Sequence, residues 1–203
     1  LNGQGTAAPH QVELELQGPL LDLLLAFDGG LRGDDWIGRL TRGELSAQQQ
    51  NWALQRPASL QRLADGRLDL GAHCWLSGPA SLCAEDQRLM PDPRIRYRLR
   101  DFALQSLADY LPEDFAWQGE LNADIELDLP AAGPNGQVQV DAGPGVLRIR
   151  DADQWHDFPY QTLALNSRLR PERVDSELRF AGGELGDLDL QLRIDPRPEA
   201  QPI

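Results

Sequence analysis

The chain has 203 residues, which is enough for one large domain or two small ones. It carries 19 basic residues, all of them Arg, against 32 acidic residues, and its formal net charge is −13. An excess of this sign repels phosphate groups, which argues against nucleic acid as a partner and against adsorption to an anionic membrane surface. Its 19 Gly and 15 Pro are too few for a disordered or collagen-like chain.

The longest apolar stretch, residues 20–27, is interrupted by Asp22. It is far shorter than the about 20 residues that cross a bilayer as a helix. Because the chain opens at Leu1 and not at a Met, we expect it to be a fragment of a longer protein.

Alternation of apolar and polar residues is the dominant pattern from residue 12 onward. In Phe115–Leu129 the odd positions are apolar or Gly, whereas the even positions from Gln118 carry amides and carboxylates. A period of two places the apolar groups on one face of a β-strand, and a helix does not segregate them in this way. With turn sequences such as Asp65-Gly66 between the runs, we expect about a dozen strands. The further runs are 12–16, 21–27, 68–74, 94–100, 138–140, 163–169, 174–180 and 188–194.

Two segments depart from this period. Phe102–Leu111 has apolar residues at positions 104, 107, 108 and 111, a spacing that predicts a short helix ended by Pro112. The stretch from Asp151 to Asp157 is expected to be a loop.

Short sequences recur along the chain. Trp-x-Gly-x-Leu occurs at 36–40 and 117–121, and Gly-Glu-Leu occurs at 43, 119 and 183. This weak repetition favours an elongated sheet of amphipathic units that stack on their neighbours.

A sheet with one apolar face must cover that face. Two sheets can form a sandwich, a sheet can close into a solenoid, a barrel can face lipid, or the sheet can fold lengthwise into a trough that holds apolar cargo. The scattered Trp residues (36, 52, 75, 117 and 155) do not form the two girdles that a barrel needs. The Leu-rich, aromatic-poor face suits alkyl chains, although an ordinary sandwich core is equally compatible with this composition.

The residues that carry chemistry are few. Cys74 and Cys83 lie nine positions apart around Gly78-Pro79, a hairpin spacing that favours a disulfide over a zinc site with His73, because further ligands are lacking nearby. Paired acids such as Asp124 and Asp128 lie on polar strand faces, where a solvated role is more common than a catalytic one. The sequence therefore predicts neither an enzyme nor a cofactor or metal site.

Three features together resemble one family. The first is Trp36-Ile37-Gly38-Arg39-Leu40, followed by Trp52-Ala53-Leu54 and Pro57-Ala58-Ser59-Leu60. The second is Cys74-Trp75 with Ala80-Ser81-Leu82-Cys83, and the third is the turn 102–112 that leads into Trp117-x-Gly-x-Leu121. In this order, from about residue 10 to 195, the chain resembles the translocation and assembly module TamB family of Gram-negative envelopes.

The resemblance implies a fold and a cellular setting. It implies an all-β, elongated, folded-over amphipathic sheet, the β-taco or open solenoid, with an apolar groove over residues 12–195, and with edge segments at 1–11 and 196–203. It implies an internal fragment of a periplasmic parent that is anchored in the inner membrane. The paired cysteines of the family support the Cys74–Cys83 bridge.

The resemblance also implies a function. The parent moves phospholipid to the outer membrane and assists assembly of outer-membrane proteins such as autotransporters, with an outer-membrane barrel of the TamA type bound through a part of the parent outside this chain. The alternatives are a glycan-active β-solenoid enzyme and an inert structural stalk. Acyl chains, and unfolded outer-membrane strands at a sheet edge, are the expected ligands. The expected groove residues are Leu121, Ile125, Leu127, Leu129, Val138, Val140, Leu147, Ile149, Leu163, Leu165, Leu178, Leu188, Leu190 and Leu192.

Overall fold

The computed structural model describes residues 10–19, 21–47 and 50–196. Residues 1–9 and 197–203, which make up most of the two predicted edge segments, lie outside the described residues. The chain divides into two compact units, which are described separately. Unit 1 comprises Leu1–Gly78 and Leu82–Arg96, and unit 2 comprises Pro79–Ser81 and Tyr97–Ile203.

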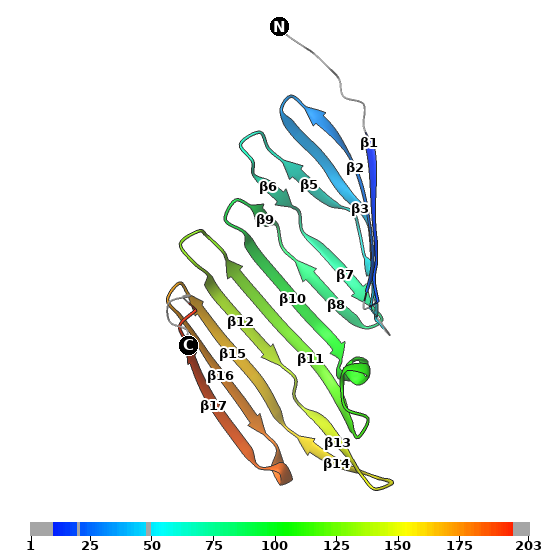
Figure 1. The fold of residues 1–203 in the computed structure, drawn as a ribbon, viewed down its shortest axis with the longest axis vertical. Coiled ribbons are helices and arrows are strands. Elements are labelled where there is room, and N and C mark those ends of the chain that lie inside the picture. The colour runs from blue at the N-terminus through cyan, green and yellow to red at the C-terminus, as the bar shows by residue number, and fades with distance from the viewer. Residues whose placement is uncertain (1–9, 20, 48–49, 197–203) are drawn as a thin grey trace. The chain divides into compact units, whose positions relative to one another are not determined.

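Both units are built from antiparallel strands (Figure 1). This confirms the predicted all-β class. The strands follow the alternation of the sequence, because each run with a period of two has one face that avoids water and one that seeks it.

In unit 1, β1 pairs with β2, and β2 pairs with β3. The long strand β3 then pairs with β4 through its C-terminal part and with β5 through its N-terminal part. Strand β4 continues to β7, and β5 continues through β6 to β9. The strands of this region are β1 (His10–Gln17), β2 (Asp22–Arg32), β3 (Asp35–Ala47), β4 (Gln50–Leu54), β5 (Ala58–Arg62), β6 (Leu68–Leu70), β7 (His73–Ser77), β8 (Ala80–Ala84), β9 (Gln87–Met90) and β10 (Arg94–Ala103).

In unit 2, the C-terminal half of β11 pairs with β12 and its N-terminal residues pair with β13. One series runs β12–β15–β16–β17, and the other continues from β13 to β14. The elements that follow β10 are η1 (Leu104–Tyr110), β11 (Phe115–Asp128), β12 (Asn135–Asp141), β13 (Gly145–Asp151), β14 (Gln154–Tyr160), β15 (Thr162–Arg170), β16 (Arg173–Ala181), η2 (Gly183–Leu185) and β17 (Asp187–Ile194).

The two departures from the strand period have different outcomes. The predicted short helix is confirmed as the 3-10 helix η1, which ends before Pro112 and buries Leu104 completely. The predicted loop at Asp151–Asp157 is wrong, because β13 extends to Asp151 and β14 begins at Gln154. The residues at the start of β14 are exposed, so no apolar period marks this strand in the sequence.

The core is small for a chain of this length. Among the described residues, the buried hydrophobic side chains are Leu40, Ala58, Ala80, Ala84, Leu104, Ala123, Ala142 and Tyr160. Most apolar strand residues are only half-buried, so the sheets lack the dense second layer that a sandwich core requires.

Candidate functional site

The apolar face of unit 2 is assembled row by row from the strand register. Ala123 of β11 pairs with Val140, and Val140 also pairs with Leu165 of β15. Leu165 pairs with Leu178, which pairs in turn with Leu190 of β17. Directly paired residues project from the same face of a sheet, so these side chains form one apolar row across five strands.

Parallel rows flank this one. In the next row, Ser167 and Ser176 interrupt the aliphatic side chains, and their hydroxyl oxygens share a hydrogen bond of 2.8 Å. Each serine therefore has the other as a hydrogen-bond partner on this face. The flanking rows are Leu163–Phe180–Leu188, Ile125–Val138–Ser167–Ser176–Leu192 and Leu127–Gly136–Leu169–Val174–Ile194. We call these rows together the apolar strip.

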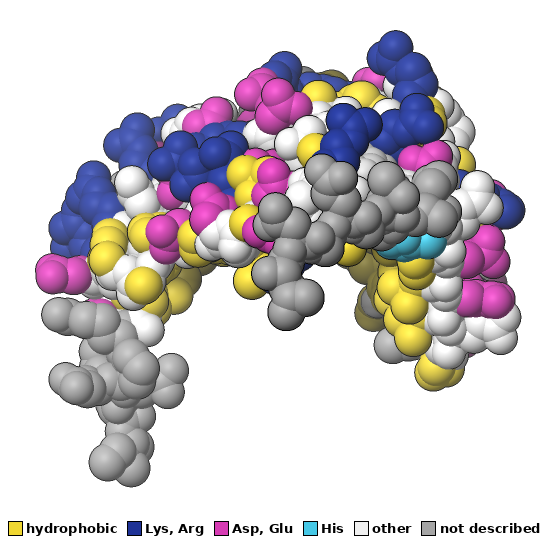
Figure 2. Space-filling model, turned by 90° about the horizontal axis from the view of Figure 1, so that it is seen from above, with side chains coloured by type: hydrophobic (Ala, Val, Ile, Leu, Met, Phe, Trp, Pro, Cys, Tyr) yellow, Lys and Arg dark blue, Asp and Glu magenta, His cyan; other side chains and the backbone are white. Residues whose placement is uncertain are grey.

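The apolar strip is most open along β17, the edge strand of unit 2 (Figure 1). Leu188, Leu190, Leu192 and Ile194 are 50%, 49%, 49% and 47% exposed. The span from Leu188 to Ile194 is six residue steps along the strand, which is about 20 Å at the usual rise. Figure 2 shows hydrophobic side chains on one side of the strands and charged side chains on the other.

The structure brings most of the predicted groove residues into the apolar strip. Leu147 and Ile149 lie instead on β13, opposite Trp117 and Phe115 of β11. Leu121 lies on β11 between its two ladders, and Leu129 lies just past the end of that strand. The strip also contains five residues that lie at apolar positions of the predicted runs but outside the predicted groove set: Ala123, Leu169, Val174, Phe180 and Ile194.

A closed cluster adjoins the β13 side of the same unit. Tyr160 is 1% exposed, and its hydroxyl donates to the carbonyl of Ala142 at 2.5 Å. The same oxygen accepts a hydrogen bond from Trp117 Nε1 at 2.8 Å. Burial raises the pKa of Tyr160, because the charged phenolate would lose its hydration. Here the protein fills its own interior, in contrast to the apolar strip.

Unit 1 repeats the amphipathic pattern. Leu16 pairs with Leu23, which pairs with Leu45. Along β1 the apolar side chains are again about half exposed, as for Leu14 at 51%. The same principle of a one-sided sheet with an open edge therefore holds in both units.

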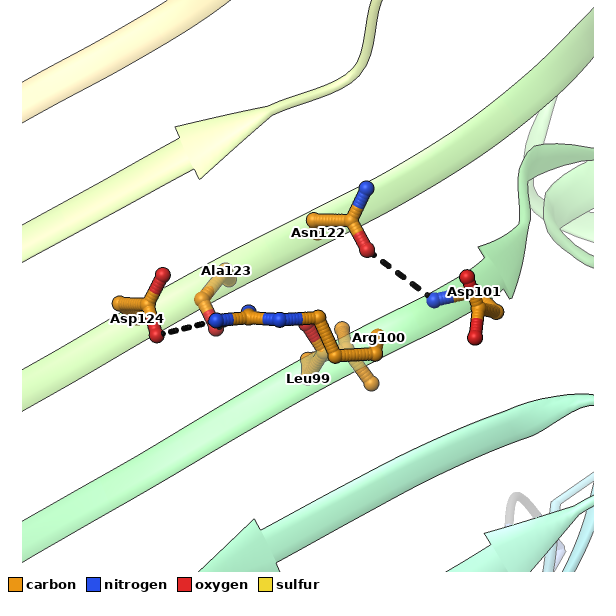
Figure 3. A network of polar contacts seen from close by, with 6 residues as sticks. All are labelled: Leu99, Arg100, Asp101, Asn122, Ala123 and Asp124. Carbon is orange, nitrogen blue, oxygen red and sulfur yellow. Dashed lines mark hydrogen bonds and ion pairs between the residues drawn. The ribbon is translucent and has the colours of Figure 1, made fainter.

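The polar faces are crossed by ion pairs. In unit 2, Arg100 Nη2 donates to Asp124 at 2.6 Å, and its Nη1 donates to the carbonyl of Ala123 (Figure 3). Beside it, the amide of Asp101, a residue at φ +55°, donates to the Asn122 side chain at 3.1 Å.

A shallow hollow of about 560 Å³ on this polar face contains Asp175 and Glu177. Arg193 donates to Asp175 at 3.0 Å and Arg179 donates to Glu177 at 2.6 Å. The hydrogen bond from Arg193, together with the charge of Arg173, lowers the pKa of Asp175. A carboxyl group that is held ionised is unsuited to be a general acid. Of the two acids singled out in the sequence, Asp124 is ion-paired with Arg100, and Asp128 also has an interaction partner.

The cysteine prediction is confirmed. Cys74 and Cys83 form a disulfide that links β7 to β8 in unit 1, with their Cα atoms 4.0 Å apart. His73 is buried, and its Nδ1 lies 2.9 Å from the carbonyl oxygen of Gly71. No cluster of three or more His, Cys, Asp or Glu side chains suited to a metal occurs within the described ranges. Nor does any helix there have the length and apolar character needed to cross a membrane.

Comparison with protein families agrees with this architecture. The model of a family described as "TamB, N-terminal domain" matches residues 1–203. The chain belongs to the TamB family. No solved structure matches the chain. The match is to the N-terminal domain of TamB, and the expectation that the chain is an internal piece of its parent stays a prediction.

Membership of the TamB family indicates the general role and location of the chain. The family is linked to outer-membrane protein assembly and lipid transport, implies a partnership with TamA, and is not known to be catalytic. TamB proteins are periplasmic, and the Cys74–Cys83 disulfide is consistent with an oxidising compartment.

Proposed function

We propose that this TamB domain carries phospholipid by letting acyl chains lie along the apolar strip of unit 2. The observation that carries the proposal is the half-exposure of the aliphatic side chains of β17, at 47–50%. A face of this kind gains about 25 cal/mol for each Å² that a guest removes from water. An acyl chain offers that area without requiring any polar partner from the strip.

The chemistry of the strip suits a mobile guest. Leu is the commonest residue of the strip, and its two serines are hydrogen-bonded to each other. A passing methylene chain therefore meets mainly apolar side chains, and the rows of the strip contain no charged residue that would hold it at one place. The head group would stay in water beyond the open edge of β17.

The same edge supports a second role in the assembly of outer-membrane proteins. An exposed edge strand offers backbone donors and acceptors to an extended segment, which is the basis of β-strand addition. All eight residues of β17 are exposed. We propose that a nascent outer-membrane strand pairs there, and that the TamA barrel is contacted by a part of the parent outside this chain.

The experiment is site-specific photo-crosslinking in the full-length protein in the periplasm. A photoreactive residue at Leu190 should form adducts with phospholipid. The matched control is Gln191, the next residue on the same strand, whose side chain lies on the polar face beside Glu177. Adducts of equal yield at both positions would contradict the proposal.

A charge placed on the strip gives an independent readout. Leu190→Arg should leave the chain folded, because this side chain is already 49% exposed, and should reduce lipid adducts at neighbouring positions. Gln191→Arg adds the same charge on the other face and should leave them unchanged. A folded Leu190→Arg protein with undiminished lipid adducts would refute acyl transport along this face.

A further inference from the structure

A hollow of about 370 Å³ lies on the polar face of unit 1, between strands β5, β6, β9 and β10. Its lining is rich in hydrogen-bond donors, with three Arg side chains and the hydroxyl of Ser59. Two carboxylates, Asp69 and Asp86, also line it. Three Arg against two Asp leave an excess of one positive charge in a chain whose net charge is −13.

The register sets two arginines against each other in this hollow. Gln61 pairs with Asp69, Asp69 pairs with Arg88, and Arg88 pairs with Arg94. Like charges directly opposite each other on adjacent strands destabilise a sheet. A bound anion between them would turn this repulsion into attraction.

The nearby carboxylates do not supply that anion. Asp69 is held by Arg67 at 2.6 Å, and Asp86 accepts a hydrogen bond from the backbone amide of Ala72 at 2.9 Å. Within the described residues, the guanidinium groups of Arg88 and Arg94 form no hydrogen bond or ion pair. Arg88 Nε is also buried without a partner. Buried donors are nearly always satisfied in folded proteins, so this atom marks a guanidinium group that lacks an acceptor within the described chain.

We propose that Arg88 and Arg94 bind a phosphate group. Paired residues on neighbouring strands have Cα atoms about 5 Å apart, so one tetrahedral anion can accept hydrogen bonds from both guanidinium forks. The site consists of residues of unit 1, whereas the apolar strip belongs to unit 2, so this proposal stands independently of the proposed path of acyl chains. The phosphate can be a free anion or the head group of a lipid in an adjacent membrane.

The test measures binding of inorganic phosphate to the full chain by calorimetry, at constant ionic strength with chloride as the competing anion. The wild-type chain should show saturable binding, and Arg94→Gln should weaken it by about tenfold or more, because a charge-assisted contact is lost. Arg56→Gln removes one charge at an exposed position outside the hollow and should leave the affinity unchanged.

A second variant separates loss of phosphate binding from loss of folding. Arg88→Lys keeps the charge but loses the fork, and it should weaken binding in a protein with an unchanged circular dichroism spectrum. Absence of saturable phosphate binding to the wild-type chain would overturn the site. Equal losses in Arg94→Gln and Arg56→Gln would overturn it as well, because they would reduce the effect to net charge.

Vesicles distinguish the two sources of phosphate. The wild-type chain is tested for flotation with vesicles of phosphatidylglycerol in phosphatidylcholine and with vesicles of pure phosphatidylcholine. Flotation with the mixed vesicles alone, abolished by Arg94→Gln, would assign the site to a lipid head group. Calorimetric binding of phosphate without flotation would assign it to a free anion.

Discussion

Tyr160→Phe tests how much the buried hydroxyl of Tyr160 stabilises unit 2. The substitution removes one oxygen and keeps the ring. That oxygen accepts from Trp117 Nε1 at 2.8 Å and donates to the carbonyl of Ala142 at 2.5 Å. It is buried in a side chain that is 1% exposed, so water cannot readily replace it.

The expected loss follows from the two groups left behind. Each buried polar group without a partner costs about 1–3 kcal/mol. Ala142 is 2% exposed and bears the full penalty, whereas the half-buried Trp117 can recover part of its loss from water. We therefore expect Tyr160→Phe to lower the free energy of unfolding by about 2–4 kcal/mol.

The assay is urea unfolding followed by far-ultraviolet circular dichroism, with unchanged m values as the check on two-state behaviour. Tyr110→Phe is the matched control, because Tyr110 is 61% exposed, and it should change stability by less than about 0.5 kcal/mol. A double-mutant cycle with Trp117→Phe should give a coupling of about 1 kcal/mol. A loss below about 0.5 kcal/mol for Tyr160→Phe would refute the argument that this hydroxyl closes the unit.

Three further predictions concern pH and the disulfide. Burial raises the pKa of Tyr160, so the contribution of Tyr160 to stability is complete below the pKa of about 10 in the unfolded chain and falls as the pH rises above it. Raising the pH above this value should therefore destabilise the wild-type chain more than the Tyr160→Phe variant. The hydrogen bond from Arg193 lowers the pKa of Asp175, so the contribution of Asp175 to stability is present above the model-peptide pKa of 3.8 and lost as the pH falls below it. Hydrogen exchange of β17 should therefore accelerate below this pH, and Arg193→Gln should reduce the pH dependence of that exchange. Replacing Cys74 and Cys83 together with Ser should lower the free energy of unfolding by about 2–3 kcal/mol, and non-reducing mass spectrometry should show the two linked in the wild-type chain.

The strands and their faces were predictable because the period of two is a local property of the sequence. In Phe115–Leu129 the alternation correctly indicates β11, and the rows built on its apolar positions follow from it. The short helix was predictable for the same reason, since Leu104, Leu107 and Ala108 recur with a helical period. The sequence does not contain the pairing of strands distant along the chain, such as β12 with β15.

Identical short sequences adopt different structures in this chain. Gly-Glu-Leu is strand at Gly43 and at Gly119, but at Gly183 it forms the turn η2. At Gly183, two neighbouring glycines and a φ of +56° allow the chain to reverse before β17. Composition alone therefore cannot separate a repeated strand from a turn.

The Trp-x-Gly repeat has a structural counterpart in both units. In unit 1, Gly38 pairs with Gly29, and a Cβ on either glycine would collide with the Trp36 ring. In unit 2, Gly119 pairs with Gly145, and a Cβ at Gly145 would collide with Tyr160. Each unit thus uses a glycine pair to seat an aromatic ring against the sheet. The ring is the motif's own Trp36 in unit 1 but Tyr160 of β14 in unit 2, so the two arrangements are not equivalent, and true repetition stays a prediction.

The two faces of unit 2 differ in how completely the protein satisfies them. The polar face pairs its charges internally, as Arg193 with Asp175 and Arg100 with Asp124. The apolar face is not satisfied in the same way. Leu190 on this face is 49% exposed, although the same unit buries another leucine, Leu104, completely (0% exposed). Since leaving a leucine in water forgoes stabilisation that burial would provide, a sheet that does so along a whole strand is suited to contacts that form and break. Under the proposed function, this exposed strand is where transient contacts with acyl chains form, whereas an inert stalk predicts no such contacts.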